Sequence, residues 1–185
     1  MIAFFLFGPV AAFIAEFVHW LFLNVTGSDA PLGPAIKIAA VLSTLFGFWL
    51  GSWVYAHVGR GLRGNSFLSL SLMFGFGILF RVVAMTVVNY AVLLYVGPVL
   101  FGANYMAYAK VVLQQTTGWQ FSGDADLLFW VLVFTAVYNI INLIVAAIPA
   151  GLIVSPLTNS FRHITSVDSW LSRSVRAKSA SLAKV

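Results

Sequence analysis

Four long apolar stretches constrain this chain more than any other feature of its sequence. They cover approximately residues 4–23, 35–57, 67–96 and 127–154, and crossing the hydrocarbon core of a membrane takes about 20 helical residues. Only 8% of the residues are charged, against roughly a quarter in an average soluble domain. The sequence therefore predicts an all-α, polytopic bundle of transmembrane helices.

Charge is distributed unevenly between the loops, and this orients the chain. By the positive-inside bias, the loop at 58–66 and the C-terminal tail are cytoplasmic, whereas the loops at 24–34 and 97–126 are external. We expect a membrane bundle over 1–158 and a basic cytoplasmic tail over 159–185, in a multi-pass protein of the cell membrane. Since topology accounts for the basic charge, no nucleic-acid partner is predicted. The residues behind this assignment are Arg60 and Arg63 in the first loop, Arg162, Arg173, Arg176, Lys178 and Lys184 in the tail, and Asp29, Asp124 and Asp126 outside.

The residue types that support catalysis are missing or scattered. The chain has no cysteine, its three histidines lie in different segments, and no carboxylate pair shares a helix face within a span. Neither Gly-x-Ser-x-Gly nor a glycine-rich phosphate loop occurs. We therefore predict no enzyme activity, no catalytic residue, no metal site and no resident cofactor.

Small residues at four-residue spacing predict close helix packing, because they allow helix backbones to approach each other in lipid. The long external loop contains "NYMAYAKVVLQQ", which predicts a short surface helix. With its aromatic residues, this loop is either a lid over a site or an anchor at the membrane interface. The small-residue pairs are Gly8 and Ala12, Ala11 and Ala15, Ala35 and Ala39, Gly47 and Gly51, and Ala147 and Gly151.

Three ionisable residues fall inside the apolar stretches, namely Glu16, Lys37 and Arg81. Such groups are costly at membrane depth and usually face a bundle interior. At 1.5 Å of rise per residue, Glu16 and Arg81 both lie near mid-bilayer, which predicts an ion pair between them. Lys37 lies closer to the outer surface.

Three asparagines form a second polar set. Asn89, Asn139 and Asn142 all fall in the middle or the external half of their spans, and Asn139 and Asn142 share a helix face because they are three residues apart. Asparagines in membrane helices often hydrogen-bond across helices. The alternative is that they receive a polar ligand that enters from outside.

Four segments resemble one family, in the correct order along the chain. They are "FLFGPVAAFIAEFVHWL", "GPAIKIAAVLSTLFGFWLGSWVY", "AMTVVNYAVLLY" and "VYNIINLIVAAIPAGLIVSPLT". Together they are similar to the substrate-binding S components of energy-coupling factor (ECF) vitamin transporters, and within these to the riboflavin type. The resemblance covers most of 4–158.

The resemblance implies a six-helix bundle that binds a vitamin at its external side and assembles with a transmembrane energy-coupling subunit and two ATPase subunits. Gly8 and Pro9 would form a cytoplasmic turn. The family's first helix would precede the position where this chain begins, so the bundle as given would lack it.

The same resemblance suggests where riboflavin, as the transported ligand, is held. Lys37 would supply a cation, with Asn89, Asn139 and Asn142 as hydrogen-bonding groups and Tyr90 and Tyr95 as stacking groups. Lys37 has a second interpretation, in which it extends to the outer headgroups of the membrane. The competing functions are an S component for another vitamin or small metabolite, and a structural or interaction membrane protein whose asparagines only join helices.

Overall fold

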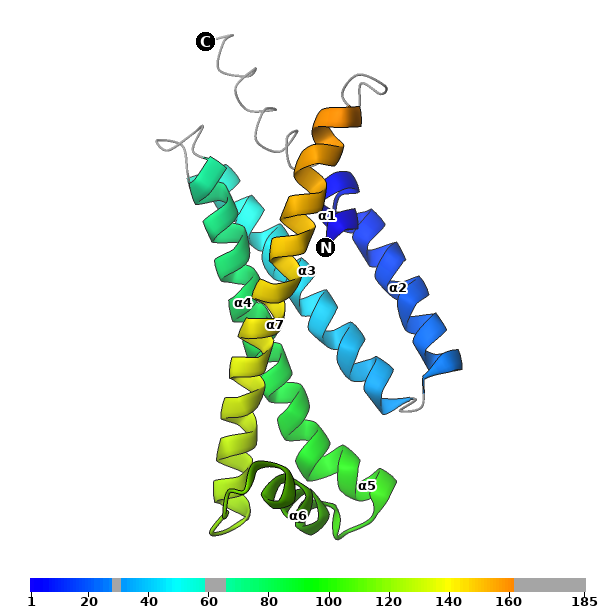
Figure 1. The fold of residues 1–185 in the computed structure, drawn as a ribbon, viewed down its shortest axis with the longest axis vertical. Coiled ribbons are helices and arrows are strands. Elements are labelled where there is room, and N and C mark those ends of the chain that lie inside the picture. The colour runs from blue at the N-terminus through cyan, green and yellow to red at the C-terminus, as the bar shows by residue number, and fades with distance from the viewer. Residues whose placement is uncertain (28–30, 59–65, 162–185) are drawn as a thin grey trace.

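The computed structural model describes residues 1–27, 31–58 and 66–161, and every regular element within them is helical. Four of the helices are long and apolar enough to cross a membrane, as the sequence predicted. The elements, shown in Figure 1, are α1 (Ile2–Phe7), α2 (Pro9–Thr26), α3 (Leu32–Val58), α4 (Ser66–Ala91), the π-helix η2 (Val92–Val96), α5 (Gly97–Phe101), α6 (Tyr105–Thr117) and α7 (Asp124–Phe161).

The first apolar stretch is divided at Gly8. This glycine has a φ of 94°, a conformation that side chains with a Cβ rarely adopt. Pro9 then occupies the first helical position of α2, where its missing N–H costs nothing. Gly8 and Pro9 therefore form the expected turn, and the first long helix starts at Pro9 instead of near residue 4.

The third crossing is longer than predicted. α4 continues without interruption through η2 into α5 and ends at Phe101, before Gly102 with a φ of 99°. The wider turn of a π-helix changes which side chains share a face. Residues after Ala91 are therefore rotated relative to the helical pattern that α4 alone would extend.

α3 and α4 pack backbone against backbone. A Cβ added to Gly47 would lie 2.5 Å from the carbonyl oxygen of Phe76, and one added to Gly51 would lie 2.6 Å from that of Leu72. Such contacts require glycine at both positions. The close approach predicted from the Gly47 and Gly51 spacing is confirmed.

An aromatic cluster joins α1 to this helix pair. Phe4 and Phe5 are buried and lie 5.6 and 5.8 Å, between ring centroids, from Phe48 of α3, which in turn lies 5.1 Å from Phe74 of α4. The hydrophobic core continues to Leu143 and Ala150 of α7. The short α1 is therefore anchored inside the bundle instead of lying on its surface.

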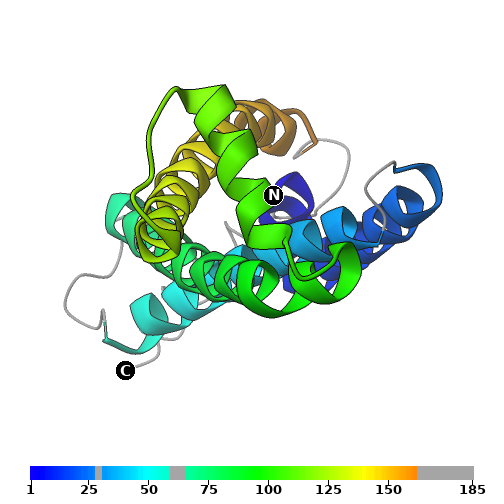
Figure 2. The same cartoon turned by 90° about the horizontal axis from the view of Figure 1, so that it is seen from below.

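The remaining helices surround this core unevenly. α7 lies across α4 (Figure 1), and α6 crosses the end of the bundle at which α7 begins (Figure 2). α2 lies to one side, next to α3. The predicted short helix in the long loop is thus confirmed as α6.

The helix directions group the loops as the charge pattern requires. α2 ends and α3 begins at the end of the bundle where α5 ends and α7 begins (Figure 1). Which end faces the cytoplasm stays a prediction. Arg60, Arg63 and the basic tail beyond Phe161 lie outside the described residues.

Candidate functional site

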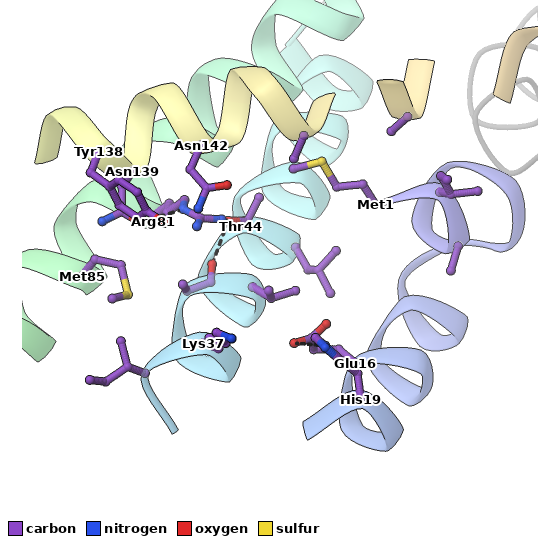
Figure 3. A pocket seen from close by; sticks show the side chains of 18 of the residues that line it. Met1, Glu16, His19, Lys37, Thr44, Arg81, Met85, Tyr138, Asn139 and Asn142 are labelled. Atoms are coloured by element: carbon purple, nitrogen blue, oxygen red, sulfur yellow. Dashed lines mark hydrogen bonds and ion pairs between the residues drawn. The ribbon is translucent and has the colours of Figure 1, made fainter. Parts of the chain in front are cut away.

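A cavity of about 850 Å³ lies between α2, α3, α4 and α7, and the first residues of the chain close part of it. Most of its wall is apolar, but ten polar or charged residues also line it. They are Glu16 and His19 of α2, Lys37 and Thr44 of α3, Arg81 and Asn89 of α4, and Thr135, Tyr138, Asn139 and Asn142 of α7. Figure 3 labels most of them.

Arg81 forms the centre of the hydrogen bonding in this cavity. Its Nε donates to Asn139 Oδ1 at 2.9 Å, and its Nη1 donates to Thr44 Oγ1 at 3.4 Å. The arginine is only 8% exposed and the asparagine 3%. One guanidinium group therefore connects α4 to both α3 and α7.

The partners of Arg81 are themselves held in place. Asn139 donates its amide to the carbonyl of Thr135, one turn earlier in α7, which leaves its oxygen free to accept from Arg81. Thr44 donates its hydroxyl to the carbonyl of Ala40. Because both acceptors are fixed by their own helices, the guanidinium is held in one orientation.

The ion pair predicted between Glu16 and Arg81 is not formed. Glu16 Oε1 instead lies 3.5 Å from His19 Nδ1 on the same helix. Both members of the predicted pair line the cavity, but α2 stands apart from α4 and contacts mainly α1 and α3. His19 lies three residues after Glu16 on the same helix face. It is therefore a nearer partner for the carboxylate than Arg81.

Lys37 and Asn142 line the cavity without a hydrogen bond or ion pair to any described residue. Asn89 donates to the carbonyl of Met85 in its own helix at 2.8 Å. The structure thus brings together four predicted ligand-binding residues, Lys37, Asn89, Asn139 and Asn142, on three helices.

Tyr90 and Tyr95 are the two predicted site residues that the structure does not bring to the cavity. Neither is among the residues that line the cavity, and the two pack against each other with ring centroids 6.4 Å apart. Tyr95 belongs to η2, whose wider turn alters the face on which it lies. Neither ring is therefore placed to stack on a ligand inside the described cavity.

Sequence reasoning missed four polar residues of the cavity, His19, Thr44, Thr135 and Tyr138. His19 carried a usable signal, since its spacing from Glu16 places both on one face. Tyr138 precedes Asn139, and Thr135 lies one helical turn before it. No local signal distinguished Thr44 from the other hydroxyl residues of its helix, because its role depends on a neighbouring helix.

The long loop contributes nothing to the cavity wall within the described residues. Its Trp119 packs on α7 instead, with ring centroids 4.9 Å from Trp130 and 5.4 Å from Phe134. The described part of the chain also holds no group of three or more His, Cys, Asp or Glu residues that could bind a metal ion.

No protein-family profile, curated protein or solved structure matches this chain. The class of protein therefore follows from its own features. They define a helical protein with four helices able to cross a membrane and a mostly apolar cavity between them that carries polar and charged groups in its wall.

Proposed function

We propose that this chain is the substrate-binding membrane subunit of an ECF-type transporter for a vitamin, with riboflavin as the favoured ligand. The observation that carries the proposal is the cavity, in which asparagines from α4 and α7 and cations from α3 and α4 meet inside a bundle of membrane-spanning helices. The choice of riboflavin comes from the family resemblance of the sequence.

The size and lining of the cavity support a small organic ligand. Its volume of about 850 Å³ lies within the range of roughly 300–1,000 Å³ that is typical of such sites. A mostly apolar wall with a few convergent polar groups suits a flat ring that carries amide groups at its edge. Asn139 and Arg81 are already oriented by their hydrogen bonds.

The two ends of the cavity differ, and this supports entry from one side. Met1, Ile2 and Ala3 line one end, and the aromatic cluster of Phe4, Phe5 and Phe48 packs directly beside them. Gly33 and Lys37, from the first turns of α3, line the other end. The positive-inside bias places that second end outside the cell, as uptake requires.

Transport would need partners, because the chain contains no nucleotide-binding motif. We expect the chain to assemble with an energy-coupling transmembrane subunit and two ATPase subunits when all are expressed together. The chain alone should hydrolyse no ATP.

Binding is tested most directly by adding riboflavin to the purified protein and recording quenching of the flavin fluorescence. A matched pair of variants locates the site. Asn89 and Asn24 each donate to a carbonyl four residues earlier in their own helix, at 2.8 Å, but only Asn89 lines the cavity. Asn89→Ala should weaken binding by about 1–3 kcal/mol, and Asn24→Ala should leave it unchanged.

A colourless protein that fails to quench riboflavin would remove this ligand from the proposal. The same titration with other vitamins and small metabolites then tests an S component of different specificity. If none binds, the transport function fails as well.

One observation favours a second candidate, a structural membrane protein in which polar residues only join helices. Arg81 connects three helices, and Asn89 is satisfied within its own helix. Under this alternative, variants of Arg81 and Asn139 would lower stability, and no soluble small molecule would raise the melting temperature. The two Asn→Ala variants above would then behave alike.

A further inference from the structure

The charge of Arg81 is not neutralised by any described residue. Its two hydrogen bonds go to the neutral side chains of Asn139 and Thr44, whereas a guanidinium group carries five N–H donors. The one contact between an acidic and a basic side chain among the described residues joins Glu16 Oε1 to His19 Nδ1 at 3.5 Å, and it is an ion pair only with a protonated His19. A cation at membrane depth without an anion is costly and usually marks a functional site.

The other charged side chains of the cavity leave an excess of positive charge. Lys37 and Arg81 supply two positive charges, against one carboxylate, Glu16, which already pairs with His19. The lining side chains therefore carry a formal charge of +1 with a neutral His19 and of +2 with a protonated one. The acidic group sits on α2, across the cavity from the wall that α4 and α7 form around Arg81 (Figure 3).

An uncommitted hydrogen-bonding group accompanies the guanidinium. Asn142 makes no hydrogen bond to a described residue, and it lies one helical turn after Asn139, the residue that accepts from Arg81. Figure 3 shows its amide directed into the cavity on the same wall as Arg81. The amide can donate two further hydrogen bonds there.

We propose that Arg81 and Asn142 form a subsite for an oxyanion, a carboxylate or a phosphate group, carried by the small molecule that the cavity takes. Guanidinium groups bind such groups through paired, charge-assisted hydrogen bonds. This inference rests on the proposed binding function and adds the chemical class of the ligand. It predicts that the cavity binds an anionic ligand more tightly than a neutral one such as riboflavin.

Two matched pairs of probes separate this inference from the proposed function. Riboflavin 5′-phosphate and riboflavin differ by one anionic group on the same flavin, and benzoate and benzamide differ by charge on the same ring. Binding of each is measured in nanodiscs of zwitterionic lipid, by fluorescence for the flavins and by melting temperature for the benzene derivatives. We expect the anionic member of at least one pair to bind about tenfold or more tightly than its neutral partner.

Three variants test whether Arg81 causes the preference for the anionic probe. Arg81→Gln should abolish it, Arg81→Lys should retain part of it, and Lys110→Gln, which removes a cation from α6 outside the cavity, should leave it intact. Should Arg81→Gln fail to fold, Asn142→Asp keeps the arginine and places a carboxylate in the subsite. It should reduce the anion preference, whereas Asn142→Leu should reduce it less.

The outcomes differ for the two proposals. Riboflavin that binds as tightly as its phosphate, with benzoate no better than benzamide, overturns the oxyanion subsite and leaves flavin binding standing. Benzoate binding that depends on Arg81, without any flavin binding, supports the subsite and removes riboflavin. Stabilisation through Arg81 by an anionic lipid added to the nanodisc, with none by the soluble anions, assigns the site to a headgroup and overturns the inference.

Discussion

The two sides of α3 are built in different ways. On one side, glycines at 47 and 51 bring its backbone against that of α4, with no room for even a Cβ. On the other, α3 shares with α2, α4 and α7 a cavity of about 850 Å³ lined with charged and amide groups. We call the first region, Gly47 and Gly51 against Leu72, Met73, Phe76 and Gly77, the glycine seam.

The contrast follows from what holds helices together in a membrane. Lipid tails are as apolar as leucine, so apolar side chains alone do not drive helices together, and close packing must supply the attraction. Glycine provides it at the seam. On the cavity side, Arg81 reaches across to α3 and α7 by hydrogen bonds, so these helices are joined through long side chains. One region supports stability and the other leaves room for a ligand.

Filling the glycine seam should produce the largest effect. Gly47→Leu should lower the free energy of unfolding by about 3 kcal/mol, near the upper end for an overpacked site, because its Cβ alone would lie 2.5 Å from a backbone oxygen. Gly75→Leu is the matched control, since nothing lies within 4 Å of a Cβ at that position of α4. Melting temperatures in detergent measure the stability of both variants. Equal losses of stability would mean that a side chain is tolerated as well at the glycine seam as at Gly75.

Breaking the Arg81 network should have the next largest effect. A double-mutant cycle with Arg81→Met and Asn139→Leu should give a coupling energy of about 1–2 kcal/mol, because the hydrogen bond joins two buried side chains. The cycle of Arg81→Met with Glu16→Gln should be additive to within about 0.5 kcal/mol, since no ion pair connects them. Strong coupling in the second cycle would restore the pair that the sequence predicted.

The sequence predicted the features of this comparison that depend on a single helix. Apolar length placed the four long helices. Gly47 and Gly51 were one of five small-residue pairs expected to allow close packing, whereas Gly8 of another pair lies in the turn before α2. Helical periodicity also explains why Asn139 and Asn142 share the cavity wall, because residues three apart lie on one face.

Contacts between side chains of different helices could not be predicted in the same way. Whether Glu16 meets Arg81 depends on how far α2 stands from α4, which no local pattern encodes. Thr44 was missed for the same reason, since its hydroxyl matters only because Arg81 reaches it from α4. Tyr90 directly follows the cavity-lining Asn89, and one residue turns an α-helix by about 100°, so its ring points away from the cavity. Tyr95 lies in η2, where the regular rotation of the helix changes.

The role of Lys37, on the cavity side of α3, is open to a direct test. It lines the cavity but makes no hydrogen bond or ion pair to a described residue, so a role in ligand binding and extension to the headgroups both fit its position. If it binds the ligand, Lys37→Met should weaken riboflavin binding by about 1 kcal/mol. Lys110→Met on α6 should change nothing, and unchanged affinity in both variants would assign Lys37 to the membrane surface.

The smallest expected effect is the change in riboflavin affinity on replacing Tyr90 or Tyr95. It tests whether ligand contacts extend beyond the residues that line the cavity. Tyr90 and Tyr95 lie outside the cavity and contact each other, whereas Tyr138 lines it beside Asn139. Tyr90→Leu and Tyr95→Leu should therefore change riboflavin affinity by less than about 0.5 kcal/mol, as surface substitutions do.

Tyr138→Leu is the comparison for that pair, and it should weaken binding measurably because an aromatic ring on the cavity wall can contact a flat ligand. All three substitutions remove the same aromatic group from a helix, so they differ mainly in position. A loss of affinity at Tyr90 or Tyr95 that equals the loss at Tyr138 would extend the binding site beyond the described cavity, towards η2 and α5.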